Sequence, residues 1–233
     1  MKITPGRGAS VLAVLAIVVA VMIVACGPRA ADYSPVKATT TAAAEADEPA
    51  DETAGQTGTD STAPTPIADY LSSVGVTGEQ VPLDKLTDLK VTLPRPPGWT
   101  KYANPNLSPG TEAIAKNNTY PTAMVMVFKL NGNFDVAEAL KHADASAEMS
   151  ENFTKLNYSE ADFKGFPSSM IEGSYDLNGQ RLHTYNRIVI PVTPAPKFQR
   201  YLVQFTVTSL SRQAAPEAGD IESVIGGFTV AVT

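Results

Sequence analysis

The stretch IEGSYDLNGQRLHTYNRIVI, residues 171–190, carries the clearest folding signal in the chain. Asn178-Gly179 is the dipeptide that two-residue β-hairpin turns prefer, because both positions require a positive φ. Apolar residues alternate before this turn, and a second β-type run from Leu182 to Ile190 comes after it. The pattern predicts two antiparallel strands joined by a tight turn.

Two further segments extend this hairpin into a sheet. In one, Tyr201, Val203, Phe205 and Val207 would point to one face, and Leu202, Gln204, Thr206 and Thr208 to the other. The first set is apolar and the second is half polar. Residues 124–130 are apolar on both faces, with Met124, Met126 and Phe128 on one and Val125 and Val127 on the other. Such a segment is typical of a central strand that is covered on both sides.

Helical patterns flank these strands. Ile67, Tyr70 and Leu71 predict a short amphipathic helix, and a capping box at residues 135–138 predicts a helix over 136–149. Pro216-Glu217 opens a last helix that ends at Gly226-Gly227, and short strands are expected at 89–93 and 228–232. The fold class predicted is therefore α+β, with a mostly antiparallel central sheet flanked by helices.

The N-terminal 26 residues have the features of an export signal. Lys2 and Arg7 precede seventeen uncharged residues, and the run ends at Val24-Ala25-Cys26. These last residues resemble the lipobox of bacterial lipoproteins, in which the cysteine is acylated and becomes the new N-terminus. The alternative is an uncleaved transmembrane anchor, since about 20 apolar residues span a bilayer. Either way the rest of the chain is exported, and the expected lipid anchor is Cys26 on the outer face of the plasma membrane.

Residues 27–66 differ in composition from the C-terminal part of the chain. They are rich in Ala, Thr, Pro and acids, and they hold seven acids against Arg29 and Lys37. We expect a disordered tether here, which as a flexible coil of 40 residues reaches a root-mean-square length of about 35 Å. Its threonines could accept O-linked sugar, or it could be a plain spacer. Residues 67–233 then form one globular domain whose net charge is only -3.

Composition excludes several function classes. A single cysteine cannot form an internal disulfide or a multi-cysteine metal site, and a net charge of -6 offers no basic footprint for nucleic acid. No nucleophile elbow, phosphate loop or complete metal-binding motif is present, so we expect no cofactor, no metal and no enzyme. His183 shares a predicted strand face with Arg181, Tyr185 and Arg187, which favours a solvated polar face over a degenerate hydrolase site.

Several strings in the domain resemble a known family. They are Ile67 to Leu71, the turn from Leu93 to Trp99, Gly165-Phe166, Gly173 to Tyr175, and the stretch from Val189 to Phe205. Together with the lipobox and tether they are similar to the LpqN/LpqT family of mycobacterial lipoproteins. The resemblance implies a PsbP-like α/β/α sandwich, a place in the cell envelope, and a role near the MmpL-type transporters that move trehalose-linked mycolic lipids. It implies no catalytic residue.

Flexible methionines on predicted strands suggest a ligand groove between sheet and helices. The candidate residues for binding an acyl glycolipid are Met124, Met126, Phe128, Met170, Tyr185, Tyr201, Gln204 and Phe205. The alternative is that these residues are simply the core. The function expected is lipid trafficking by binding such a glycolipid, its transporter, or both, and the alternative is a protein-interaction module that touches no lipid.

Overall fold

A computed structural model describes residues 63–233. The expectations for the signal segment, the lipid anchor at Cys26 and most of the tether therefore lie outside the described residues. Within residues 63–233, none of the helices is long and apolar enough to span a bilayer.

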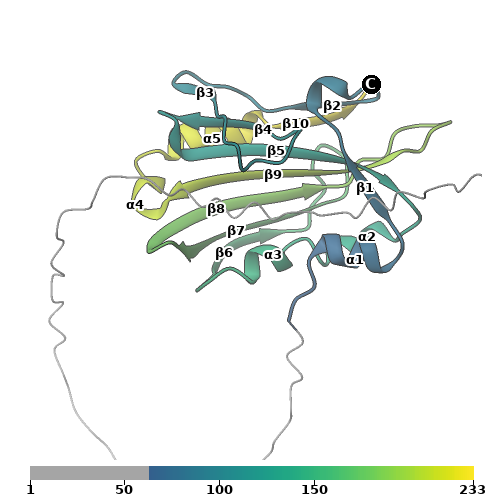
Figure 1. The fold of residues 1–233 in the computed structure, drawn as a ribbon, viewed down its shortest axis with the longest axis horizontal. Helices are drawn as coiled ribbons and strands as arrows, with labels where there is room; N and C mark the ends of the chain where they lie inside the picture. The colour runs from purple at the N-terminus through teal and green to yellow at the C-terminus, as the bar shows by residue number, and fades with distance from the viewer. Residues whose placement is uncertain (1–62) are drawn as a thin grey trace, which may run out of the picture. The chain divides into compact units, whose positions relative to one another are not determined.

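The described part is built on an antiparallel sheet of eight strands (Figure 1). The strand order is β3-β4-β5-β9-β8-β7-β6, and β1 pairs with β5 beyond the end of β4. These strands are β1 (Thr77–Gln80), β3 (Trp99–Lys101), β4 (Glu112–Lys116), β5 (Thr119–Asn131), β6 (Thr154–Ser159), β7 (Ser168–Leu177), β8 (Gln180–Val189) and β9 (Arg200–Leu210). A separate ribbon pairs β2 (Leu89–Thr92) with β10 (Thr229–Val232).

Short helices lie on both sides of the sheet. They are α1 (Ile67–Ser73), α2 (Val136–Leu140), α3 (Ala145–Glu148), α4 (Ser211–Ala214) and α5 (Ala218–Gly227), with a 3-10 turn, η1, at Leu83–Lys85. The predicted fold class, a mostly antiparallel sheet with flanking helices, is confirmed.

The predicted hairpin is the pair β7–β8. Asn178 and Gly179 both have positive φ, 51° and 74°, as the two-residue turn requires. The ladder pairs all ten residues of β7 with β8 in unbroken register, from Leu177 opposite Gln180 to Ser168 opposite Val189. The prediction from the Asn-Gly signal is thus confirmed.

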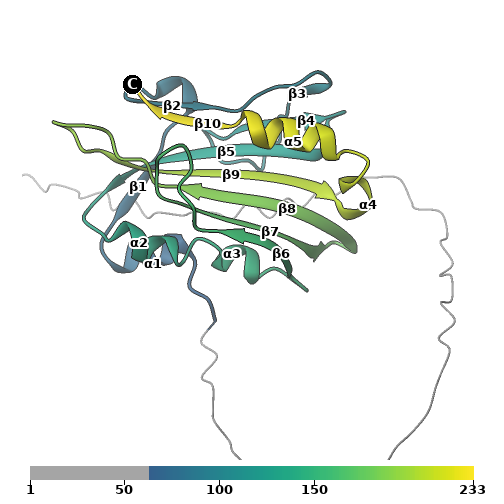
Figure 2. The same cartoon turned by 180° about the vertical axis from the view of Figure 1, so that it is seen from behind.

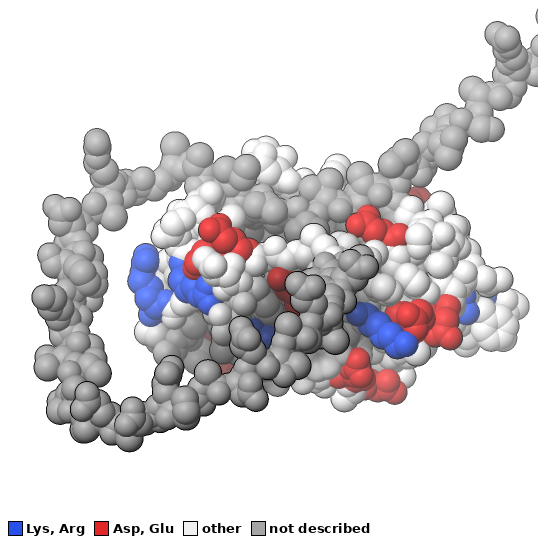
Figure 3. Space-filling model, turned by 90° about the horizontal axis from the view of Figure 1, so that it is seen from below, with Lys and Arg blue, Asp and Glu red and all other residues white. Residues whose placement is uncertain are grey.

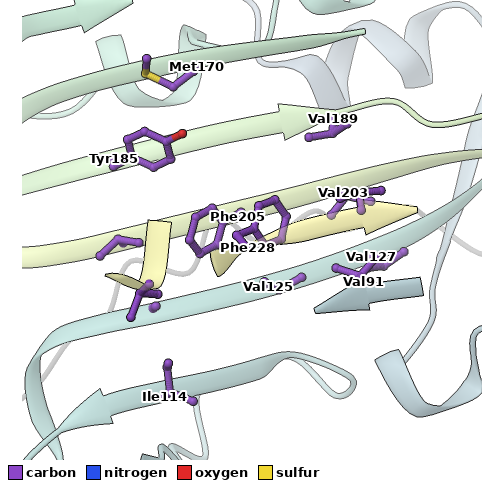
Figure 4. Close-up of a cluster of buried hydrophobic side chains, with 14 of the residues drawn as sticks. Val91, Ile114, Val125, Val127, Met170, Tyr185, Val189, Val203, Phe205 and Phe228 are labelled. Atoms are coloured by element: carbon purple, nitrogen blue, oxygen red, sulfur yellow. The ribbon is translucent and has the colours of Figure 1, made fainter. Parts of the chain in front are cut away.

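We call the side of the sheet that carries Val125 the first face. Its core contains Val125 and Val127 of β5 together with Val203 and Phe205 of β9, packed against Phe228 (Figure 4). The helix α5 and the β2–β10 ribbon cover this face (Figure 2). Lys116 of β4 forms ion pairs with Glu217 and Asp220 at the start of α5, which joins the helix to the sheet.

The second face carries the alternate residues of the same strands. At one end of it, Met126, Phe128, Leu130 and Leu202 pack against Leu71 of α1 and Ala139 of α2. The two hydrophobic clusters thus lie on opposite sides of one sheet, as the apolar pattern on both faces of residues 124–130 predicts.

The helix predicted over 136–149 is wrong as a single helix. Asp135 caps α2 by accepting a 2.9 Å hydrogen bond from the backbone N–H of Glu138, but the helix ends at Leu140. The next three residues make i→i+3 hydrogen bonds, and the side chain of Asp144 accepts a 3.1 Å bond from Ser169 of β7. The helix is therefore interrupted where Asp144 contacts the sheet, and α3 begins only at Ala145.

Candidate functional site

The eight candidate binding residues divide equally between the two faces. Opposite residues in the β5–β9 ladder point to the same side, so Val125 and Phe205 share the first face while Met126 and Gln204 share the second. The second face holds Met124, Met126, Phe128 and Gln204, and the first face holds Met170, Tyr185, Tyr201 and Phe205. The eight residues therefore cannot line one groove.

The four first-face residues are part of the core. Phe205 is fully buried and stacks on Phe228 with ring centroids 4.2 Å apart. The Tyr185 ring packs edge to face with Phe205, with ring centroids 5.9 Å apart. The Tyr201 hydroxyl donates a 2.7 Å hydrogen bond to Asp88. That bond lowers the pKa of Asp88, and burial raises the pKa of Tyr201. Figure 4 shows Met170, Tyr185 and Phe205 among the same buried side chains.

The polar residues expected around His183 also lie on the first face, toward β6. Nε2 of His183 lies 3.0 Å from Glu172. The Arg187 guanidinium donates to the Tyr185 hydroxyl at 2.8 Å and to Ser168 at 2.9 Å. Each of these groups already has a partner within the sheet.

Arg181 completes this polar network at the hairpin end. It donates to Ser174 at 2.8 Å, to Thr154 at 2.9 Å and to Asp176 at 3.2 Å. The pKa of Asp176 is lowered by hydrogen bonds from Asn152 and Arg181. The network joins strands β6, β7 and β8, so its role is structural.

The second face carries a polar strip that the sequence pattern only partly revealed. Register places Thr122, Thr208 and Thr184 side by side on β5, β9 and β8, with Thr206 in the next row between Met124 and Asn186. We call these four threonines the threonine strip. The helices α1 and α2 pack against another part of this face, where Met126 and Leu202 lie.

Hydrogen bonding within this strip is incomplete. Thr206 donates to Asn186 Oδ1 at 2.9 Å, and Asn186 Nδ2 donates to Thr184 at 3.2 Å. The hydroxyl of Thr122 is buried and has no hydrogen-bond partner among the described residues. Because a buried hydroxyl without a partner is costly, the strip has capacity for a further hydrogen bond.

Apolar and aromatic side chains border the threonine strip. Tyr120 and Tyr175 flank its hairpin end, where burial raises the pKa of both hydroxyls, that of Tyr175 to about 12. Phe153 covers the strip's β7 side above Gly173, and Ser108 reaches Met126 from the loop between β3 and β4. The buried apolar residues around the strip belong to neither hydrophobic cluster; they are Ala113, Ala115, Ile171, Leu182 and Leu210.

The side chains in and beside the threonine strip are mostly neutral. These rows combine a half-buried thioether at Met124, an amide at Gln204 and a row of hydroxyls, and on β5, β9 and β8 they hold no charged side chain. Lys155 of β6 continues the row of Thr184, opposite Gly173. Among residues 63–233, no three His, Cys, Asp or Glu side chains come together as a metal site. Thr122, Thr184 and Thr208 are 3%, 3% and 7% exposed, so the accessible groups of these rows are Thr206, Met124 and Gln204.

Charge is dispersed where the domain surface is visible. Figure 3 shows acidic and basic side chains interspersed among uncharged residues on the underside of the domain. Basic side chains lie close to acidic ones; the Nζ of Lys155, for example, lies 2.6 Å from a carboxylate oxygen of Glu148. This arrangement fits the near neutrality of residues 67–233.

Comparison with known proteins identifies the family. Residues 63–231 match the family described as "Probable lipoprotein LpqN". Lipoprotein LpqT of Mycobacterium tuberculosis is 52% identical over 220 residues, which cover 94% of this chain and 92% of LpqT. The proline-rich 28 kDa antigen of the same species is 36% identical over 168 residues, which cover 70% of this chain and 53% of the antigen.

A solved structure supports the fold. The crystal structure of LpqN, a protein described as involved in cell envelope biogenesis of Mycobacterium tuberculosis, matches with a TM-score of 0.62 at 20% identity. The match covers 71% of this chain and 97% of LpqN, and at that identity it bears on the fold alone. The resemblance drawn from the sequence strings is confirmed, and the chain belongs to the LpqN family of lipoproteins.

Proposed function

We propose that this protein is a lipid-anchored lipoprotein on the outer face of the plasma membrane that binds an acyl glycolipid and assists its traffic through the cell envelope. Support for the location comes from the lipobox at Cys26 and from the envelope role described for LpqN. The ligand class proposed is a trehalose-linked mycolate, and an MmpL-type transporter is the proposed partner.

The observation that carries this proposal is the composition of the second face around the threonine strip. Met124 is half-buried and lies outside both hydrophobic clusters, as do Leu182 and Leu210. Burying a row of threonines, one of them with an unpartnered hydroxyl, costs folding free energy. A core formed only for stability would be expected to hold apolar residues at these positions. Thioethers adapt to chains of different shape, and the partly exposed Thr206 and Gln204 offer hydrogen bonds to ester or hydroxyl groups of a ligand.

A non-catalytic role is supported by where the candidate bases lie. His183 is paired with Glu172 on the first face, on the other side of the sheet from the threonine strip. On the second face Thr206 and Thr184 share hydrogen bonds with Asn186, and the carboxylate of Asp144 accepts its bond from Ser169, which is outside the threonine strip. Among residues 63–233 no carboxylate or imidazole is hydrogen-bonded to a hydroxyl of the strip, as activation of a nucleophile would require.

The test is native mass spectrometry of residues 26–233 carrying Cys26→Ala, so that the chain has no acyl group of its own. Offered long-chain trehalose esters, it should show a bound adduct. Met124→Glu should abolish loading, because it places a charge among apolar groups without disturbing either cluster. Gln180→Glu, which adds the same charge at an exposed position, is the matched control. Absence of any adduct with every acyl glycolipid offered would overturn the proposal.

A second candidate is a protein-interaction module, which the exposed edge of the sheet favours. Leu156 and Tyr158 of β6 are 59% and 42% exposed, and Met149 nearby in sequence is 54% exposed. A photo-crosslinker at Leu156 in cells should then yield one partner that Tyr158→Lys removes, while glycolipid loading is unchanged. If crosslinking yields nothing specific, this second candidate fails.

A further inference from the structure

The connection between β8 and β9 exposes a phenylalanine. Phe198 is 65% exposed, the largest exposed fraction among the large hydrophobic side chains described. Its φ is 45°, in the left-handed region that bulky residues rarely adopt. Burial does not explain this conformation, because most of the ring has no protein contact.

The loop that presents Phe198 is held firmly. The backbone N–H of Thr193 donates to the carbonyl of Gln199 at 2.9 Å, and the N–H of Gln199 donates back to the Thr193 hydroxyl at 2.9 Å. The Gln199 side chain donates to the carbonyl of Leu130 on β5 at 2.8 Å. An unfavourable φ and an exposed aromatic ring are thus maintained by a rigid support, and such outliers cluster at functional positions.

Further exposed apolar and basic residues lie in the loop and near its base. Val192 and Val232 are each 37% exposed. Lys197, adjacent to Phe198, is 63% exposed and lies 3.4 Å from Asp88. Val232 belongs to the same region, because the next residue donates its N–H to the carbonyl of Asp88. We call Val192, Lys197, Phe198 and Val232 the loop-tip patch.

We propose that the loop-tip patch inserts Phe198 into the interfacial region of a lipid bilayer, giving the domain a membrane contact besides the acylated N-terminus. An aromatic ring beside a lysine fits the boundary between acyl chains and headgroups, where the ring is buried and the cation remains among phosphates. The rigid loop means that little conformational freedom is lost on insertion.

The length of the chain outside the structure points to a membrane as the occupant. Forty residues separate Cys26 from the start of α1, and a random coil of that length spans about 35 Å, so a domain anchored at Cys26 would stay within reach of the bilayer. Tethering at that range raises the effective concentration of the patch at the surface, so a weak insertion suffices. This inference rests on the lipid anchor of the proposed function, but it is independent of any glycolipid bound on the second face.

The experiment measures partition of residues 26–233 with Cys26→Ala onto vesicles of phosphatidylcholine and phosphatidylglycerol. Phe198→Gly should lower the partition coefficient at least about ten-fold. Leu156→Ala, which truncates a side chain of similar exposure on β6, should leave it unchanged. The melting temperature of Phe198→Gly should not fall, since glycine accepts the left-handed φ without strain.

A spectroscopic measurement tests the geometry of insertion. The chain has one tryptophan, Trp99, which is 3% exposed in the core. The indole introduced by Phe198→Trp should be quenched by brominated lipids in the vesicles, and Trp99 in the parent chain should not. Equal partition of the parent and Phe198→Gly, or an indole that brominated lipids do not quench, would overturn the proposal. A photo-crosslink from the loop tip to another protein that Phe198→Gly removes, together with no vesicle binding by the parent chain, would also overturn the proposal. The loop tip would then dock a protein and not a bilayer.

Discussion

Gly173→Ala should destabilise the protein more than a single methyl group suggests. Gly173 lies in β7 on the second face, opposite Lys155 of β6 and Thr184 of β8. A Cβ atom at this position would lie 2.4 Å from Cζ of Phe153 and 2.7 Å from the carbonyl oxygen of Thr154. The φ of Gly173 is not positive, so the effect is one of space and not of backbone conformation.

The magnitude can be worked from these two distances. Ordinary carbon contacts are about 3.5–4.0 Å, so the Phe153 ring must move by more than about 1 Å. The Thr154 oxygen belongs to the backbone of β6 and can retreat only by distorting its pairing with β7. Overpacking of this kind costs about 1–3 kcal/mol, which for a domain of this size lowers the melting temperature by about 2–12 °C.

Thermal melts monitored by circular dichroism measure this effect. The control is Gly219→Ala in α5, where a Cβ meets no atom within 4 Å and where alanine should stabilise the helix by about 0.5–1 kcal/mol. Combining Gly173→Ala with Phe153→Ala should recover part of the loss, because the ring clash is removed. A Gly173→Ala protein that melts with the parent would refute the close approach of Phe153 to β7.

Further predictions concern the core and the pH dependence of stability. Phe205→Ala should lower the free energy of unfolding by about 3–5 kcal/mol in urea titrations, because the ring is fully buried against Phe228; a loss below about 1 kcal/mol would contradict its core position. Burial raises the pKa of Asp144 to about 6. The folded state therefore binds this proton more tightly than the unfolded state, and stability falls as pH rises from about 4 to about 6. Asp144→Asn should remove that fall. It should raise the free energy of unfolding at pH 7 by about 1–2 kcal/mol, after allowance for partial exposure, and leave it unchanged near pH 3. Equal effects at both pH values would count against a raised pKa at Asp144.

The sheet was predictable where local signals and burial agree. The Asn178-Gly179 turn, the alternation along β9 and the apolar run of β5 each specify a strand by themselves. Strand β6 was not predicted, because its residues are mostly exposed at the edge and show no alternation. Strand β4, with the sequence EAIAK, has no strong strand preference and owes its conformation to pairing with β5.

The candidate site was only half predictable, for a reason of register. Alternation assigns the residues of one strand to two faces, but it does not say which face of the next strand lies beside them. Met170 and Tyr185 share the first face with Val125 only because of how β7, β8 and β9 align. The sequence pattern therefore joined residues from opposite sides of the sheet into one supposed groove.

The threonine strip was missed for a related reason. Thr206 and Thr208 are visible as the polar side of an alternating strand, but Thr122 and Thr184 come from other strands and join them only through the ladders. A threonine on a strand is common by itself, since β-branched residues favour strands. The threonine strip is recognisable only in the folded sheet, where three strands place these hydroxyls side by side.

The most direct test of the central claim is a methyl NMR titration with methionine labelled in residues 26–233 carrying Cys26→Ala. Met124 and Met126 report on the second face, and Met170 reports on the first. On addition of a long-chain trehalose ester, the account predicts that the methyl signals of Met124 and Met126 shift while that of Met170 stays in place. A shift confined to Met170, or no shift at any of the three, would contradict the assignment of the ligand site to the second face.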